Sequence, residues 1–168
     1  LRDEIGAAGG RCEISVGDVT RQDDCDAMVA RCVEAFGSVY SVFANAGYGL
    51  DEPVARTTDE QARQMFEVNF FGTMNAYRPA LPHMVRAGAG HILVCSSSIG
   101  KIALPGSGMY CATKAAQNHI GRAMNLELRR KGVHVSTVHP VGTRTEFFEE
   151  LRRRSGNGGA TFDQHAPG

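Results

Sequence analysis

The sequence predicts an α/β protein built on a three-layer, doubly wound parallel sheet. Segments with helical periodicity alternate with short apolar segments, in the order α, β, α, β, α, β, α, β, α. Such alternation is typical of a parallel sheet covered by helices on both faces. The 168 residues fit one ordinary domain or a part of a larger one, and we take residues 1–168 as a single domain.

Composition argues against several classes of function. Hydrophobic residues make up 42% and charged residues 21% of the chain, and 18 Lys and Arg balance 18 Asp and Glu. A net charge of zero argues against general electrostatic binding to nucleic acid or to an anionic membrane. No segment approaches the roughly 20 apolar residues that span a bilayer. The five cysteines include no CxxC pair, so we expect reduced thiols in a cytoplasmic protein.

The first part of the chain is predicted to contain two helices and two strands. Residues 1–8 have the pattern of the last turns of a helix, which a Gly-Gly pair ends. Residues 11–16 alternate enough to form a short strand. Residues 25–36 are predicted to be a helix, because their apolar members recur along one helical stripe. The apolar run at residues 39–44 predicts a strand buried on both faces.

A long helix is predicted to follow. Thr58 and Gln61 form a capping box that starts this helix, and Pro79 and Pro82 are expected to kink its last third. Residues 155–168 are expected to be a flexible, Gly-rich tail or the start of a substrate lid. The remaining elements are a strand, a helix, a strand and a short helix, at residues 91–95, 108–130, 133–138 and 145–154.

Small or polar segments follow all four predicted strands. In open parallel sheets, ligands bind beyond the carboxyl ends of the strands. We therefore expect a ligand at this edge of the sheet. The four segments are Asp18-Val19-Thr20, Asn45-Ala46-Gly47, Ser96-Ser97-Ser98 and Pro140-Val141-Gly142.

A tyrosine and a lysine predict proton-transfer chemistry. Tyr110 and Lys114 are four residues apart in a predicted helix, which puts them on one face. A phenol titrates near pH ~10 and is a poor acid or base at neutral pH, but a nearby ammonium lowers its pKa. The pair is then suited to exchange a proton with an alcohol or a carbonyl. The alternative is a solvated pair, since this spacing also arises by chance.

Two other polar residues support such a site. Ser97 lies thirteen residues before Tyr110 at the end of a predicted strand, where its hydroxyl would hydrogen-bond the oxygen that the tyrosine protonates. Asn69 lies inside the long helix, which is unfavourable for Asn unless its amide has a partner. The alternative is an exposed Asn, although its apolar neighbours argue against exposure.

Together these residues resemble the active site of the short-chain dehydrogenases/reductases, and the resemblance covers nearly the whole chain. Ser97, Tyr110 and Lys114 resemble the catalytic set of the family, and Asn69 resembles its fourth member. The resemblance implies a Rossmann-type fold, incomplete in this chain, with NAD or NADP as cofactor. The implied cofactor contacts are Asp18 and Val19 at the adenine, Asn45, Ala46 and Gly47 beside the cofactor, and Pro140, Thr143 and Thr145 at the nicotinamide.

The resemblance also implies a mechanism, in which a hydride passes between the nicotinamide and a substrate carbon. Tyr110 would pass a proton to or from the oxygen of a small alcohol or carbonyl substrate, and Ser97 would hold that oxygen. Lys114 would lower the pKa of the tyrosine and bind the nicotinamide ribose. Asn69 would keep a water in a proton relay to Lys114. The substrate would therefore contact Ser97 and Tyr110.

The sequence departs from the family pattern in two ways. Val141 stands where Gly is usual and Thr143 where Val or Ile is usual, which affects the local backbone. The Gly-rich turn that holds the pyrophosphate does not precede residues 11–16. In the strand order 3-2-1-4-5-6, two strands are then missing between residues 11–16 and residues 39–44. We therefore expect a fragment of a longer protein that also lacks its C-terminus.

The sequence also leaves other functions open. One is a non-catalytic fragment used for binding or assembly, and another is an epimerase or dehydratase, which shares the Tyr-Lys pair. No metal site is expected, because no two histidines have HxxxH spacing. The family implies a homodimer or homotetramer formed through the two long helices. The apolar residues near the C-terminus either line a substrate pocket or pack as an ordinary helix: Phe147, Phe148 and Leu151.

Overall fold

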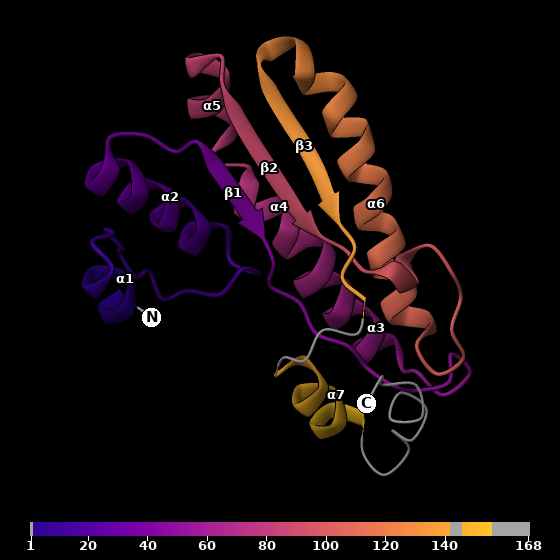
Figure 1. Cartoon of the computed structure of the whole chain (residues 1–168). Helices are drawn as coiled ribbons and strands as arrows, with labels where there is room; N and C mark the ends of the chain where they lie inside the picture. Colours follow the sequence, from indigo (N-terminus) through magenta and orange to yellow (C-terminus); the bar gives the residue numbers. More distant parts are fainter. Residues whose placement is uncertain (1, 142–145, 156–168) are drawn as a thin grey trace.

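A computed structural model describes residues 2–141 and 146–155 of the chain. Within these ranges it contains a parallel sheet of three strands in the order β1-β2-β3 (Figure 1). The strands are β1 (Ser41–Ala44), β2 (Gly90–Cys95) and β3 (Val133–Val138). Ile92 in the central strand is aligned with Val42 on one side and Val135 on the other. The predicted α/β class, a parallel sheet with flanking helices, is confirmed.

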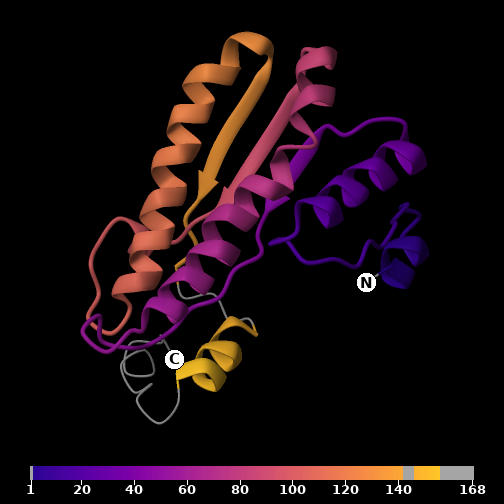
Figure 2. The ribbon, with the colours of Figure 1, turned by 180° about the vertical axis from the view of Figure 1, so that it is seen from behind.

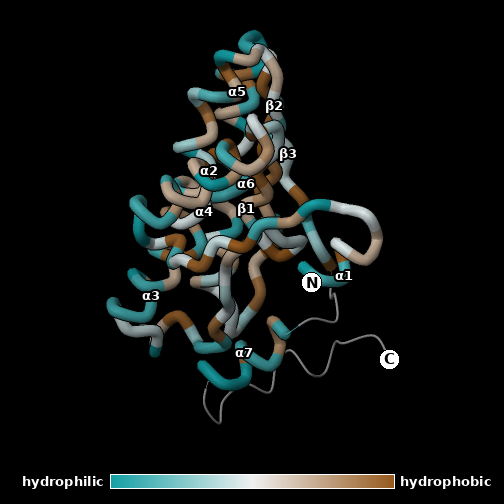
Figure 3. Tube along the Cα trace, turned by 90° about the vertical axis from the view of Figure 1, so that its left-hand side faces the viewer, coloured by the Kyte–Doolittle hydropathy of each residue, from teal (hydrophilic) through white to brown (hydrophobic). Residues whose placement is uncertain are grey.

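Helices cover one face of the sheet, and Figure 3 shows α4 (Gly72–Tyr77), α5 (Leu81–Ala87) and α6 (Gly108–Leu128) on the same side of the strands. On the opposite face, Phe43 of β1 is 55% exposed. The prediction that residues 39–44 are buried on both faces is therefore wrong, because the described helices pack against one face only. The main core joins the covered face to the helices through residues such as Val42, Ile92, Val135, Ala76, Met84 and Met124.

The predicted strand at residues 11–16 is not formed. A strand is held by hydrogen bonds to a neighbouring strand, and no strand of the described ranges pairs with this segment. Val16 is accordingly 95% exposed. The segment lies between α1 (Arg2–Ala7) and α2 (Gln22–Phe36) and is attached to α2. Arg11 donates a hydrogen bond to the carbonyl of Ala35 at 2.7 Å, and Glu13 pairs with Arg31 at 2.8 Å.

The long central helix begins as predicted and is then divided. The Thr58 hydroxyl accepts from the Gln61 amide and the Gln61 side chain accepts from the Thr58 amide, which starts α3 (Asp59–Phe66). A π-helical turn (Glu67–Phe71) follows and leads directly into α4. The helix is divided where a kink was expected: Pro79 lies in the turn between α4 and α5, and Pro82 lies in the first turn of α5, where its missing amide is tolerated. α4 stops at Tyr77, and α5 is a separate helix.

The last two helices border the carboxyl ends of the strands. The first turns of α6 lie there, and the helix then runs back along the sheet to a turn at Arg129–Lys131 that precedes β3 (Figure 1). α7 (Phe147–Ser155) lies beyond the carboxyl ends of the strands in both ribbon views (Figures 1 and 2). Within the two described ranges, no helix is long and apolar enough to cross a membrane.

Candidate active site

Three of the predicted polar segments meet at the carboxyl edge of the sheet. Asn45, Ala46 and Gly47 directly follow β1 and are exposed there. The segments after β2 and β3 are joined, because the Ser98 amide donates to the Pro140 carbonyl at 3.2 Å. This edge is where an open parallel sheet binds its ligands.

Tyr110 and Lys114 lie on the same face of α6, as their spacing predicts, and both side chains are buried. The Lys114 ammonium lies 5.4 Å from the centre of the Tyr110 ring. It donates a hydrogen bond to the Cys95 carbonyl, the last of β2, at 2.7 Å. The adjacent Ser96 hydroxyl donates to the Lys114 carbonyl at 2.9 Å. These two bonds fix the start of α6 to the end of the central strand.

Ser97 completes a group of three side chains. It lies just after β2, and its hydroxyl lies beside the Tyr110 phenol, whose pKa it lowers. The same hydroxyl accepts from the Ile99 amide at 3.4 Å, at the start of a short 3-10 turn (Ser98–Gly100). The structure thus brings Ser97, Tyr110 and Lys114 together at one point, although they come from a strand end and a helix.

Burial controls the titration of this group. Removal from water penalises the charged form of each residue, and it raises the pKa of Tyr110 to about 12, against a smaller lowering by the Ser97 hydroxyl. Burial likewise lowers the pKa of Lys114 to about 8. The pKa of Tyr110 therefore lies above the usual value of a phenol and not below it as expected, because desolvation of the phenol is the largest effect. Tyr110 is a protonated phenol at neutral pH.

Asn69 lies in the π-helical turn and is fully buried, so the expected partner of its amide exists. Its side-chain oxygen accepts from the Tyr48 amide at 2.9 Å, and its side-chain nitrogen donates to the Tyr48 carbonyl at 2.9 Å. The same nitrogen donates to the Thr113 hydroxyl on α6 at 3.1 Å. Asn69 therefore connects the segment after β1 to the helix that carries Tyr110.

Gly47 lies between Asn69 and Lys114. A Cβ atom at this position would be 3.0 Å from the Asn69 side-chain oxygen and 3.6 Å from the Lys114 ammonium. Because glycine has no side chain, the backbone at Gly47 can approach the Asn69 side-chain oxygen and the Lys114 ammonium closely. Asn69, the fourth expected member of the site, thus lies next to Lys114 with only the Gly47 backbone between them.

The other predicted cofactor contacts lie in three places. Asp18 accepts two hydrogen bonds from Thr20 at 2.9 Å each, which lower the pKa of its carboxyl group. Val19 contacts Gly72 of α4, and its carbonyl accepts from the Asn75 side chain at 3.0 Å. Pro140 is at the sheet edge beside Ser98. Thr143 and Thr145 fall outside the described residues, as does the tail from residue 156 onward.

Several residues that were not predicted from the sequence also contact the site. Gln117 donates to the Asn69 carbonyl at 2.6 Å and to the Thr73 hydroxyl at 2.7 Å. Its place three residues after Lys114, near the same helix face, was an available signal. Tyr48 carried no such signal, because its partners are distant in sequence. A small apolar cluster surrounds the tyrosine ring and includes Tyr48, Leu50, Met65, Val68, Ile99, Met109 and Phe147.

Comparisons with known proteins identify the family of the chain. The model of the short chain dehydrogenase family matches residues 1–156. An L-fucose dehydrogenase of Mus musculus is 34% identical over 167 residues, which cover 96% of this chain and 61% of the relative. An uncharacterised oxidoreductase of Listeria innocua is 29% identical over 159 residues, which cover 94% of this chain and 64% of the relative.

Solved structures agree as well. A short-chain dehydrogenase from Streptomyces avermitilis has a TM-score of 0.79 at 31% identity, over 88% of this chain and 54% of that one. A metagenomic short-chain oxidoreductase in complex with NADP has a TM-score of 0.77 at 30% identity, over 83% and 63%. The chain spans less than two thirds of the length of each of these four relatives. It belongs to the short-chain dehydrogenase family of oxidoreductases, which bind NAD or NADP in a Rossmann-type fold.

Proposed function

We propose that the protein is an NAD(P)-dependent oxidoreductase that interconverts a carbonyl compound and its alcohol. The observation that carries the proposal is the group of Ser97, Tyr110 and Lys114, with a protonated phenol and a buried ammonium at the carboxyl edge of the sheet. A protonated phenol beside a hydroxyl is suited to donate a proton to a carbonyl oxygen. Reduction of the carbonyl is the direction that the protonation states favour.

The residues at the sheet edge fit a nicotinamide cofactor. Gly47 leaves the backbone open beside Lys114, whose ammonium is suited to hydrogen-bond ribose hydroxyls. Two solved relatives are described with NADP bound. Asn45, Ala46 and Pro140 border the same edge, and we propose Asp18 and Val19 as adenine contacts and Thr143 and Thr145 as nicotinamide contacts. The bound nicotinamide supplies or accepts the hydride.

In the proposed reduction, Ser97 donates a hydrogen bond to the carbonyl oxygen of the substrate and holds it against Tyr110. The Tyr110 phenol then gives its proton to that oxygen as negative charge develops there. The Lys114 ammonium, fixed on the Cys95 carbonyl, stabilises the phenolate that remains. Asn69 and Gly47 border the side from which Lys114 would receive a replacement proton, and we propose a water relay there.

The surroundings of Tyr110 indicate the class of substrate. Phe147 of α7 lies with its ring centre 5.5 Å from that of Tyr110, and Ile99 and Met109 belong to the same apolar cluster. We propose an alcohol or ketone with an apolar substituent that packs against these side chains. We also propose that the protein forms a homodimer or homotetramer through the helices that run from α3 to α5 and along α6.

The pH dependence of carbonyl reduction tests this function. Reduction needs a neutral Tyr110, which a pKa of about 12 ensures across the working range, and a charged Lys114, whose pKa is about 8. The rate is therefore expected to be constant below pH 8 and to fall about tenfold per unit above it. Initial rates of NADH and NADPH oxidation with a panel of aliphatic and aromatic ketones measure this.

The reverse reaction provides the control for the pH profile. Alcohol oxidation needs a Tyr110 that has lost its proton beside a charged Lys114, so its rate should rise with pH up to about 8 and level off above it. Cofactor binding, followed by the fluorescence of the reduced nicotinamide, separates loss of binding from loss of chemistry. A protein that binds neither NADH nor NADPH, or that reduces ketones faster at high pH, would contradict the proposal.

A further inference from the structure

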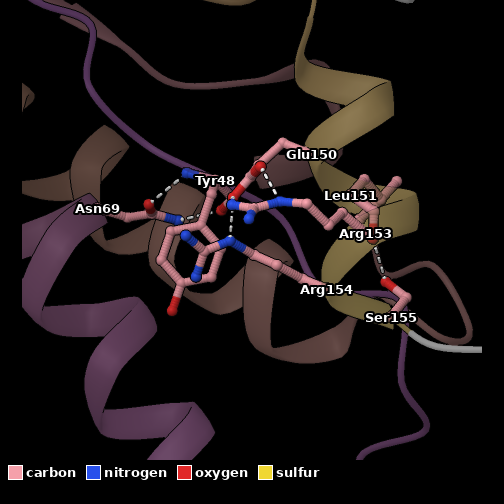
Figure 4. A network of polar contacts seen from close by, with 7 residues as sticks. All are labelled: Tyr48, Asn69, Glu150, Leu151, Arg153, Arg154 and Ser155. Atoms are coloured by element: carbon pink, nitrogen blue, oxygen red, sulfur yellow. Dashed lines mark hydrogen bonds and ion pairs between the residues drawn. The ribbon is translucent and has the colours of Figure 1, made fainter.

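Residues 48–51 are held between two elements that are far apart in the sequence. On one side lies Asn69 of the π-helical turn, and on the other lies α7 (Figure 4). Residues 48–51 are also the segment that continues from Gly47 at the proposed cofactor edge. Contacts that Asn69 or α7 makes with residues 48–51 can therefore affect the position of Gly47 in the proposed active site.

The bonds on the inner side fix the backbone of Tyr48. Asn69 accepts from its amide and donates to its carbonyl, so the side-chain amide of Asn69 pairs with both main-chain groups of one residue. Asn69 has no exposure to solvent. Movement of Tyr48 would leave buried polar atoms without partners, which is unfavourable in a protein interior. The position of Asn69 thus depends on that of Tyr48.

The contacts on the outer side come from the last turn of α7. The Arg154 guanidinium lies over the Tyr48 ring, 4.0 Å from its centre. Glu150, one turn earlier, hydrogen-bonds Arg154 and keeps the guanidinium in this position. The Ser155 hydroxyl accepts from the Asp51 amide at 2.8 Å while donating to the Leu151 carbonyl at 2.7 Å.

Gly49 allows this close approach of α7. A Cβ atom there would be 2.8 Å from the Phe147 ring and 3.0 Å from Leu151. The backbone of the segment therefore packs directly against the helix. The same Phe147 ring contacts Tyr110, so α7 touches both the catalytic tyrosine and the segment that Asn69 holds.

We infer that Arg154 is a positioning residue, which fixes Tyr48 and thereby the Asn69, Gly47 and Lys114 arrangement when α7 is packed over the site. The role in turnover rests on the proposed oxidoreductase function, whereas the link between Arg154 and the Tyr48 backbone does not. α7 carries both Phe147, which contacts Tyr110, and Arg154, which lies over Tyr48. The packing of this one helix therefore links the surroundings of Tyr110 to the side of the site where the proton relay is proposed.

Three variants of the full-length protein test the inference. Arg154→Met removes the cation and keeps much of the side-chain volume, and Arg154→Lys restores a cation. Arg153→Met is the matched control, because Arg153 also pairs with Glu150, at 2.7 Å, and its side chain is 72% exposed. Hydrogen–deuterium exchange is followed at the Tyr48 and Asp51 amides, and kcat, KM and the melting temperature are measured for each variant.

For Arg154→Met, exchange at the Tyr48 and Asp51 amides should accelerate about three- to tenfold, as expected for loss of a partly desolvated cation–π contact. We expect kcat to fall by a similar factor while KM for the cofactor stays unchanged. Arg154→Lys should recover most of both effects, and Arg153→Met should leave both at the level of the unmodified protein. A merely structural role would instead lower the melting temperature and accelerate exchange throughout the chain.

The outcomes separate the two hypotheses. Unchanged exchange at Tyr48 in Arg154→Met, or an equal effect of Arg153→Met, overturns the positioning role whatever the activity. Faster exchange at Tyr48 with an unchanged kcat also overturns it, because the link would then not reach the site. If the unmodified protein turns over no carbonyl substrate, the proposed function fails, and the exchange data alone still decide whether Arg154 holds Tyr48.

Discussion

Tyr110→Phe is expected to lower kcat for carbonyl reduction by about 10²- to 10⁴-fold, the usual contribution of a positioned proton donor. The substitution removes one oxygen atom and keeps the ring that packs in the apolar cluster with Met65 and Phe147. The Ser97 hydroxyl still accepts from the Ile99 amide. The fold should therefore persist, and cofactor binding should change little. Steady-state rates with a saturating ketone measure the effect.

Tyr40→Phe is the matched control for this experiment. Tyr40 lies next to the amino end of β1, opposite to the proposed active site, and is 65% exposed. The same loss of a hydroxyl there should leave kcat and KM unchanged. If Tyr110→Phe retains more than about a tenth of the normal kcat, the proton in turnover comes from another group and the proposed role of Tyr110 is wrong.

Lys114→Met is expected to have the second largest effect, a loss of about 10²- to 10³-fold in kcat, because an oriented charge that stabilises the developing phenolate disappears. Met has a similar length and volume, so the packing of α6 should be preserved. The pH profile should also lose its decrease above pH 8, since that decrease reflects titration of Lys114, whose pKa is about 8.

Stability should respond to this substitution in the opposite way from activity. The lowered pKa of Lys114 is caused by burial, which means that the fold holds an ammonium that water would solvate better. Removing the ammonium relieves this desolvation cost, in exchange for one hydrogen bond to the Cys95 carbonyl. The melting temperature of Lys114→Met should thus stay constant or rise. Lys131→Met, at the exposed turn before β3, is the control that should change neither property.

The elements of the fold that depend on local pattern could be predicted from the sequence. β2 and β3 follow from apolar runs, and the capping box of Thr58 and Gln61 marks the start of α3 within one residue. The Tyr110 and Lys114 pair was predictable for the same reason, because a spacing of four fixes a shared helix face. Ser97 followed from its place at the end of an apolar run.

Properties that depend on distant partners could not be predicted. Residues 11–16 have an alternating pattern, but a strand also needs a neighbour, and α2 is what they contact. The titration of Tyr110 was predicted in the wrong direction, because spacing reveals the nearby lysine but not the depth of burial. The contact of Arg154 with Tyr48 joins residues about a hundred positions apart in sequence, and no local signal marks it.

The π-helical turn at Glu67–Phe71 has a consequence for how this part of the gene tolerates change. Such a turn holds one residue more than a turn of α-helix, and each α-helical residue advances the helix by about 100°. The extra residue lets Met65 upstream and Ala76 downstream both reach apolar cores while Asn69 faces Tyr48. Deleting one codon here would leave a regular α-helix, but either Met65 or Ala76 would then no longer point into its apolar core. The number of residues in this turn is thus more strictly constrained than their identity. Substitutions should accumulate at its exposed positions, such as Phe71.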